Sequence, residues 1–455
     1  MKHRLIAALC CAALFASCMP KLYPPEVDVP EKYLHAGRDA GDSTTIPVRW
    51  WEMFCDPQLN LLVETALTNN RDLLSAASRI AQARDQLAVA RSEFMPSVGL
   101  DVSAEGDYTS RTEIVQSYAV EPALTWEVSL FGALRNTDRA ARARILASEW
   151  AWRGVGLSLA AEVATTYFTL LEYERDLAIA RRSCTLRRES AALIDSMFRY
   201  GMSDGVALEQ ARSLVYTAAA DIPQYSRAVE QTRLSLSTLL GQTPQLADTL
   251  CDCRALETDC RPEEIPAGLP SALLERRPDV MEAYYTMQQA AFEVGIARAA
   301  RYPSIALTGK GGVASTSIKG LTSGDPWAWT AVGSLAQPIF SFGKLRRREL
   351  AAKESYMQSV FAYEQTVLEA FADVETALAA IGTYRSQTEQ TRRLVEANER
   401  LADMTRALYL SGMADYLSVI DAERSLYESQ MELANLTAQQ YIACIDLCKA
   451  LGGGW

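Results

Sequence analysis

The sequence repeats itself at a spacing of 211 residues, and this repeat limits the possible architectures more than any other feature. A period so long excludes a solenoid of small stacked units and predicts two copies of one large unit. Pro96-Ser97 returns after 207 residues as Pro303-Ser304, so the copies differ by a short change in length. The motifs that recur at 211 are Phe131-Gly132 with Phe342-Gly343, Gly201-Met202 with Gly412-Met413, and Leu240-Gly241 with Leu451-Gly452.

Both copies show the same succession of elements. A first helix opens at Asp56-Pro57 in one copy and at Arg277-Pro278-Asp279 in the other, where a proline suits the first turn. The apolar period then changes to two, which predicts a β-hairpin, and afterwards returns to helical spacing. The expected segments are first helices at 56–95 and 277–302, β-hairpins at 96–131 and 303–342, long helical hairpins at 132–240 and 343–451, a linker at 241–276 and a tail at 452–455.

Each predicted strand has one apolar face and about ten residues, the length that a tilted strand needs to cross a membrane. Pro338 ends the last strand, where a ladder hydrogen bond can be dispensed with. Trp126, Trp327 and Trp329 suit the aromatic belt of a membrane barrel. The alternating positions are Val98, Leu100, Val102 and Ala104; Leu124, Trp126, Val128 and Leu130; Ile305, Leu307, Gly309 and Gly311; and Trp327, Trp329, Ala331, Gly333 and Leu335.

The long helices show heptad spacing, which predicts coiled-coil seams rather than the broad stripe of a helix on a globular core. Residues from about 134 to 200 and from 345 to 410 contain no proline, so each helix would be on the order of 100 Å long. That length suits a structure that crosses a periplasm. The predicted seams are Leu159, Val163, Thr166, Leu170, Tyr173, Leu177 and Ala180; Val367, Phe371, Val374, Leu378 and Ile381; Leu394, Ala397, Leu401, Met404 and Leu408; and Tyr427, Met431, Ala434, Ala438, Tyr441, Ile445 and Cys448.

The first 17 residues have the pattern of a secretory signal, because Lys2 and Arg4 precede a short apolar run. Cys18 follows two small residues and resembles the acylated first residue of bacterial lipoproteins. Residues 18–55 are therefore expected to form an acylated, extended segment held at a membrane surface by its lipid. An ordinary cleavage site with an incidental cysteine is the alternative.

The remaining chain carries no obvious transmembrane helix. Its most apolar stretch is interrupted by Glu162, so any membrane crossing is expected to be made by strands. Four strands per chain cannot close a barrel, and an open edge would have no hydrogen-bond partners in lipid. The protomer must therefore assemble, with eight strands in a dimer or twelve in a trimer. The formal net charge of −11 argues against a nucleic-acid partner.

The sequence contains few candidate catalytic, disulfide-forming or metal-binding residues. Cys251, Cys253 and Cys260 form a cluster in which a disulfide is plausible, although the pairing cannot be read from sequence. A zinc site is disfavoured because His35 is the only histidine after the signal. No cofactor is expected, Phe342-Gly343-Lys344 lacks the rest of a phosphate-binding loop, and an enzyme is therefore not predicted. Cys444 and Cys448 are expected to be small core residues rather than a bridge.

Several strings, taken in order, identify the chain as resembling TolC-type outer-membrane efflux factors of the lipid-anchored NodT and OprM branch. They include WWEMFCDPQLNLLVETALTNNRDL, ERRPDV, ARAARYPSIALTG, PIFSFGK, DAERSL and ALGGGW, and they cover nearly the whole chain after the signal. The resemblance implies a mainly α fold with membrane β-strands, in which a trimer forms a 12-stranded β-barrel and a periplasmic helical tunnel. It also implies a passive efflux channel docked to an adaptor and an inner-membrane pump, without nucleic acid. A periplasmic coiled-coil adaptor or lipoprotein, or a type I secretion duct, is the alternative.

The same resemblance implies a gate where the second helical hairpin turns. Asp421 matches the residue of the narrowest carboxylate ring, Leu417 an apolar ring one turn earlier, and Tyr409 a tyrosine that holds the tip closed. On spacing alone, an aspartate on a helix surface is usually only solvated. Ala414 stands where TolC itself has a latch arginine, and Ala207 where its partner aspartate would be, so that particular latch is not expected here. The expected helix turns and adaptor contacts are Gly201, Met202, Gly412 and Met413.

Overall fold

The computed structural model describes residues 30, 33–34, 47–107, 115–244, 274–323 and 327–453. The predicted signal, Cys18, His35 and the cysteines at 251, 253 and 260 lie outside these residues. The chain divides into two units, and each is described by itself. The sheet unit comprises the described residues of Ala77–Trp150 and Met281–Thr366, and the hairpin unit comprises those of Asp28–Ala76, Ala151–Val280 and Val367–Trp455.

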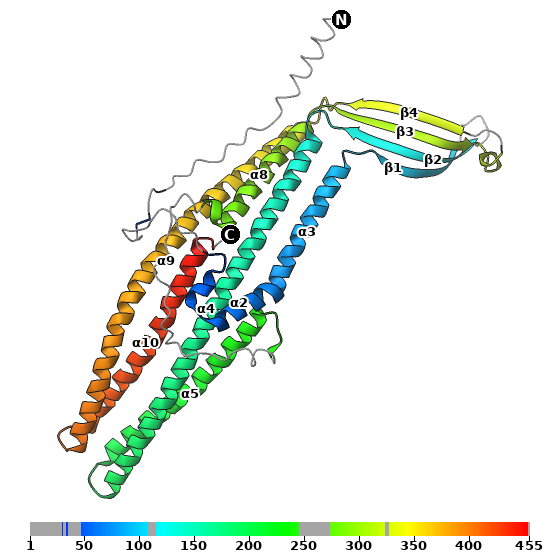
Figure 1. The fold of residues 1–455 in the computed structure, drawn as a ribbon. Helices are drawn as coiled ribbons and strands as arrows, with labels where there is room; N and C mark the ends of the chain where they lie inside the picture. Colours follow the sequence, from blue (N-terminus) through cyan, green and yellow to red (C-terminus); the bar gives the residue numbers. More distant parts are fainter. Residues whose placement is uncertain are drawn as a thin grey trace. The chain divides into compact units, whose positions relative to one another are not determined.

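The sheet unit contains one four-stranded antiparallel sheet in the order β1-β2-β3-β4 (Figure 1). The register brings the predicted apolar positions together, because Leu124 lies opposite both Val98 and Gly309. The other face is polar and carries an ion pair in which Lys310 Nζ lies 2.8 Å from Asp101 Oδ2. The predicted alternation is therefore confirmed. The strands are β1 (Ser97–Asp107), β2 (Val115–Val128), β3 (Ser304–Ser315) and β4 (Trp327–Ala336).

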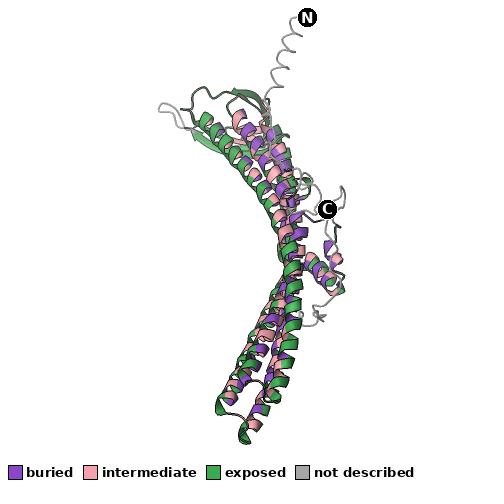
Figure 2. Cartoon of the chain, turned by 90° about the vertical axis from the view of Figure 1, so that its left-hand side faces the viewer, coloured by how far each residue is buried: buried purple, intermediate pink, exposed green. Residues whose placement is uncertain are grey.

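The apolar face of this sheet is exposed in the single chain (Figure 2). Among the described residues, β1 pairs with β2 and β4 pairs with β3, so each of these outer strands has one open edge. Prediction erred for β2, which begins at Val115 rather than near Pro122 and ends at Val128, before Leu130. The strand continues through Pro122, which lies opposite Leu100 in β1, while the pairing of β2 with β3 skips this position.

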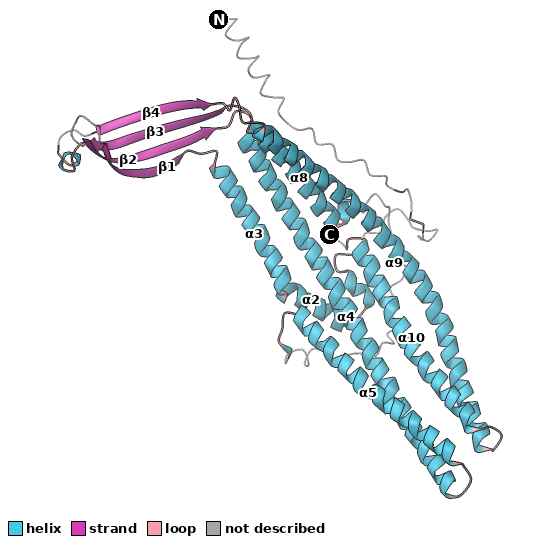
Figure 3. Ribbon diagram, turned by 180° about the vertical axis from the view of Figure 1, so that it is seen from behind, coloured by secondary structure: helices cyan, strands magenta, loops and turns pink. Residues whose placement is uncertain are grey.

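The long helices confirm the repeat residue for residue. Helices α4 (Ala133–Arg199) and α9 (Lys344–Leu410) each contain 67 residues, and α5 (Gly205–Leu239) and α10 (Tyr416–Ala450) each contain 35. All four ends of the two long helices in the second copy lie 211 residues after their counterparts in the first. Figure 3 shows the two helical hairpins, α4 with α5 and α9 with α10.

The first predicted helix is in fact two helices, α2 (Pro57–Asn69) and α3 (Arg71–Ser92). Asn70 separates them because its side-chain oxygen accepts hydrogen bonds from the backbone N–H groups of Asp72 and Leu73, which caps α3. The predicted cap at Asp56 is confirmed by a 2.8 Å bond from the N–H of Gln58. A short 3-10 helix, η1 (Trp50–Phe54), precedes α2.

The second copy begins at α8 (Pro278–Ala299), and Arg277 directly before it is buried in the hairpin unit. Its guanidinium donates to Asp279 at 3.0 and 2.6 Å and to Asp373 at 2.9 Å. It also donates to the backbone carbonyls of Ala370 and Ala450 at 3.4 and 3.3 Å. One side chain thus fastens the start of α8 to α9 and to the end of α10.

Burial along the helices corrects the seam prediction in two places. Between Leu157 and Asp176, helix α4 is buried along a broad stripe that includes Tyr167, Phe168 and Leu171, because other elements of the hairpin unit cover several of its faces. In the return helix α10, most of the predicted seam is buried from Ala434 onward, and Leu436, Ala443 and Leu447 are buried outside it. In contrast, the α9 seam lies on the surface of the single chain at Leu394, Leu401, Met404 and Leu408.

Among the described residues, one helix is long and apolar enough by composition to cross a membrane, and it is α4. Of its most apolar stretch, 61% lies buried inside the chain. Glu162, which interrupts that stretch, is exposed. This stretch therefore packs as a core helix of the hairpin unit.

Candidate functional site

Each helical hairpin turns at a glycine in the left-handed conformation. Gly201 has φ +71° and Gly412 has φ +76°. The N–H of Met202 donates to the carbonyl of Met197 at 2.8 Å, and the N–H of Met413 donates to the carbonyl of Leu408 at 2.9 Å. These bonds form the same helix-ending motif in both copies, as predicted from the glycines. Met202 and Met413 project into solvent.

Each return helix begins with an aspartate cap just after the glycine. Asp204 accepts from the N–H of Ala207 at 2.8 Å, and Asp415 accepts from the N–H and the hydroxyl of Ser418 at 3.0 and 2.6 Å. The bonds from Ser418 hold the pKa of Asp415 below its usual range. The two aspartates of the GMSD and GMAD turns are thus structural caps.

The two turns are joined by a small apolar core. Tyr409 of α9 packs against this core, its hydroxyl lies 3.9 Å from Met197 Sδ, and its ring centroid lies 5.3 Å from that of Tyr416. Ala207 also packs here. The tips are therefore held partly by apolar contacts. The core consists of Ile194 from α4, Leu208 and Ala211 from α5, and Tyr416, Val419 and Ile420 from α10.

Asp421 and Leu417 lie one turn apart on the opposite, exposed face of α10. The leucine is 51% exposed, and the aspartate side chain 56%. Asp421 Oδ1 forms a 3.1 Å ion pair with Arg424, whose Nε lies 4.0 Å from Glu428. Sequence reasoning missed Arg424, although its position three residues after Asp421 is a standard signal for a helical ion pair. The carboxylate of Asp421 is thus partly balanced by a neighbouring cation.

A polar network joins the hairpins above the apolar core. Arg406 of α9 donates to Ser190 Oγ of α4 at 3.0 Å. Glu423 of α10 lies between Arg406 and Arg187, and these cations oppose the effect of burial, which raises the pKa of its carboxyl. Arg187 also donates to the carbonyl of Leu214 in α5 at 3.3 Å. The four long helices α4, α5, α9 and α10 are therefore linked by polar and charged side chains.

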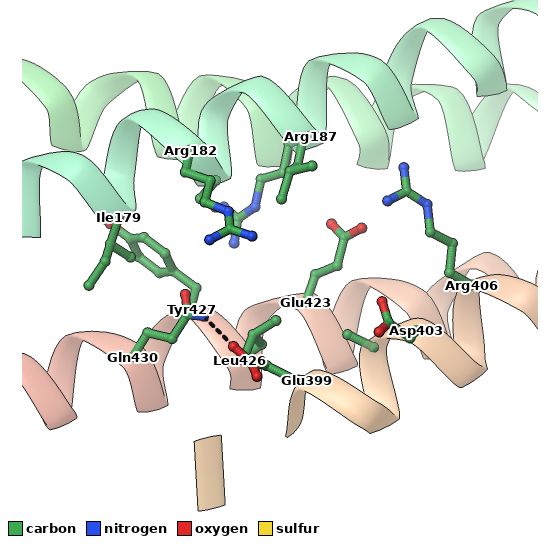
Figure 4. A pocket seen from close by; sticks show the side chains of 13 residues that line it. Ile179, Arg182, Arg187, Glu399, Asp403, Arg406, Glu423, Leu426, Tyr427 and Gln430 are labelled. Atoms are coloured by element: carbon green, nitrogen blue, oxygen red, sulfur yellow. Dashed lines mark hydrogen bonds between the residues drawn. The ribbon is translucent and has the colours of Figure 1, made fainter. Parts of the chain in front are cut away.

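This network borders a cavity of about 330 Å³ between the hairpins. Figure 4 shows Glu423 extending from α10 toward Arg187, with Arg406 on its other side. The ring of Tyr427 lies under the Arg187 guanidinium at 5.2 Å, and its hydroxyl donates to Asp221 of α5 at 2.9 Å. Arg187 is buried and lies seven residues after Ala180, in the heptad spacing of the predicted α4 seam. A charged residue at such an apolar position was the sequence signal for this network.

The structure adds one disulfide-bonded cysteine that the sequence did not indicate, Cys55. The cluster of Cys251, Cys253 and Cys260 lies outside the described residues, so the disulfide suggested there stays a prediction. Cys444 and Cys448 are free, as predicted, and burial raises the pKa of Cys444 to about 11. Within the described part of the chain, no group of three or more His, Cys, Asp or Glu side chains could hold a metal.

Comparison with known proteins gives the family. Residues 62–242 and 269–453, the two copies of the repeat, match the family described as outer membrane efflux protein. The chain belongs to the outer membrane efflux protein family. The resemblance to TolC-type efflux factors is thereby confirmed.

Relatives within the outer membrane efflux protein family match over most of their length. The chain is 32% identical over 465 residues to the outer membrane protein OprJ of Pseudomonas aeruginosa, covering 99% of this chain and 96% of OprJ. It is 33% identical over 409 residues to the probable outer membrane lipoprotein SilC of Salmonella typhimurium, covering 89% and 88%. Its fold matches the outer membrane channel CmeC of Campylobacter jejuni with a TM-score of 0.89 and 25% identity, covering 96% and 95%.

These relatives establish the class of the protein. It is an outer-membrane channel component of efflux systems, and its four strands and paired helical hairpins are the fold of such channels. The matched proteins are channels rather than enzymes. Of the three residues predicted for the gate, Tyr409 packs against the apolar core, whereas Leu417 and Asp421 lie on the exposed face of α10.

Proposed function

We propose that three copies of this chain form one channel, which passively conducts small toxic molecules or metal ions from the periplasm to the exterior. A periplasmic adaptor and an inner-membrane pump would complete the pathway. The observation that carries this proposal is the sheet, which has an exposed apolar face, a polar face and two open edges. Three such sheets joined edge to edge give twelve strands, enough to enclose an aqueous passage.

The exposed seam of α9 is a second, independent observation that supports assembly of several copies. Leu394, Leu401 and Leu408 repeat every seven residues, and Met404 lies between them on the same surface. Such a stripe is stable in water only when another helix covers it. A neighbouring copy of the chain is the partner that a closed ring of helices supplies.

We further propose that Leu417 and Asp421 face the axis of the trimer and form its narrowest point. Both side chains are exposed in the single chain and lie one turn apart, so three copies would present an apolar ring and a carboxylate ring. Like charges on a narrow axis repel one another and attract cations. The apolar core and polar network behind them would hold this point closed.

Oligomeric state and conductance test the proposal together. The purified protein is expected to require detergent, to have the mass of three chains by light scattering, and to form a cation-preferring pore of low conductance in planar bilayers. Leu401→Glu should break the trimer because it places a charge in the covered seam. Glu396→Gln, an exposed change on the same helix, is the control. A water-soluble monomer, or a bilayer without channels, would contradict the proposal.

The lipid anchor is a separate prediction. We propose that Cys18 becomes acylated and attaches the N-terminus to the outer membrane, a role supported by the small residues before it and by the lipoprotein name of SilC. Cys18→Ala should abolish incorporation of labelled palmitate, whereas Cys444→Ala should leave it unchanged. Equal labelling of Cys18→Ala and the native protein would refute acylation at this residue.

A further inference from the structure

Two carboxyl groups are buried one helical turn apart on α4, in the hairpin unit. Glu172 is 7% exposed and Asp176 is 6% exposed. Asn435 of α10 donates to Glu172 Oε1 at 2.9 Å. The charges of both carboxyl groups act on the Tyr225 hydroxyl of α5, so the pair is enclosed between α4, α5 and α10. Neither the gate nor the apolar tip core uses these side chains.

The hydrogen bonding of this pair is incomplete. Within the described part of the chain, Asp176 Oδ1 has no hydrogen-bond partner although it is buried from solvent. A buried ionised carboxylate without a partner is costly, and a second carboxylate beside it adds repulsion. Protonation of one carboxyl group removes its negative charge and supplies an O–H hydrogen-bond donor.

The groups facing the pair are acids and neutral donors. Asn435 of α10 donates to Glu172, and Tyr225 of α5 lies within the electrostatic influence of Glu172, Asp176, Asp221 and Tyr173. Tyr427 of α10 donates to Asp221. The guanidinium of Arg233 pairs with Glu174 at 2.7 Å and with Glu230 at 3.8 Å, and that of Arg187 donates to the carbonyl of Leu214, lies over the Tyr427 ring and acts on Glu423. Burial, together with the charge of Glu172, raises the pKa of Asp176 to about 7. Burial also raises the pKa of Glu172, and the bond from Asn435 opposes that effect.

We propose that Glu172 and Asp176 form a proton-binding site in which one retained proton allows α5 and α10 to pack against α4. Release of this proton leaves two neighbouring carboxylates enclosed by three helices. Their repulsion weakens the packing of these helices. The hairpin unit is thus a proton-responsive element, and this inference does not depend on conduction.

The direction of the pH dependence follows from proton binding. The unfolded chain releases this proton near the ordinary aspartate pKa of 3.8, whereas the folded chain keeps it up to about 7. Between these values the folded state binds more protons, so its stability falls as pH rises. The stabilisation is fully present below the unfolded value and is lost as pH passes the folded value.

Infrared difference spectroscopy of the full chain in detergent tests the site directly. The native protein should show the carbonyl band of a protonated carboxyl group, and this band should disappear with a midpoint about three units above that of an ordinary aspartate. Asp176→Asn should lack the band, and its thermal unfolding temperature should become less dependent on pH. Glu162→Gln, an exposed change on the same helix, should retain both properties.

A second variant keeps the test decisive if Asp176→Asn fails to fold. Glu172→Gln removes the neighbouring charge, so the midpoint of the remaining carboxyl band should move to lower pH. A native midpoint in the ordinary aspartate range, or an unchanged midpoint in Glu172→Gln, overturns the proposal. A band that vanishes at low pH on addition of sodium, potassium or calcium also overturns it, because the site would then bind a metal cation.

Discussion

Replacing Arg277 with methionine is expected to destabilise the protein more than any other single change proposed for this chain. Methionine approximates the volume of the aliphatic stem but donates no hydrogen bond. Asp279 and Asp373 would face each other without their shared cation, and the carbonyls of Ala370 and Ala450 would lose a buried donor. Breaking a buried pair costs about 3–5 kcal/mol. Because both carboxylates are about half exposed to water, we expect roughly 2–4 kcal/mol.

The measurement is urea unfolding of the detergent-solubilised protein, followed by tryptophan fluorescence. Arg276→Met is the matched control, since Arg276 is the adjacent residue and is exposed. Arg277→Lys should fall between the two, because lysine keeps the charge but loses the fork that contacts several acceptors at once. Equal stability of the Arg276 and Arg277 variants would show that the contacts of Arg277 contribute little.

The second large effect is expected at Asp421. In the proposed trimer, Asp421→Ala removes three carboxylates from the narrowest point, so single-channel conductance should rise several-fold. The same change leaves Arg424 without its 3.1 Å partner. Because carboxylates are lost and the arginines remain, the preference of the channel for cations should decrease. Reversal potentials in a salt gradient measure this preference.

Two companion variants separate charge from size. Asp421→Asn preserves the side-chain volume, so it should reproduce the change in selectivity with a smaller rise in conductance. Asp421→Ala combined with Arg424→Gln should lose most of the shift toward anions. Glu396→Gln, on the exposed surface of α9, should behave as the native channel. A native conductance and selectivity in Asp421→Ala would remove Asp421 from the gate.

Most helices and strands of this fold were predictable because their sequence patterns occur in both copies of the repeat. The 67-residue helices carry long apolar periods without proline, and the glycines at 201 and 412 mark their ends in both copies. The break at Asn70 was missed because the apolar period continues across it, and only the side-chain cap interrupts the helix. The early start of β2 was missed because Pro122 argues against a strand.

The buried charges were not predictable from one helix at a time. Periodicity assigns a charged residue to solvent, so Glu172 and Asp176 did not stand out within α4. Whether such a residue is buried depends on the other helices that cover it. The same reason explains why the polar network around Glu423 emerged only with the structure, whereas the gate position of Asp421 came from resemblance to the family.

The equal lengths of the two helical hairpins restrict how such a protein can change during evolution. A single residue inserted in α9 near Val395 would displace the following residues by about 1.5 Å and rotate them by about 100°. Arg406 would then no longer meet Ser190, and Tyr409 would leave the core that joins the two turns. A compensating insertion in α4 would restore the match only if both changes occurred together. The lengths of the two helical hairpins are therefore expected to change together. The loops between strands can change length independently, as the 207-residue offset of the strand motifs indicates.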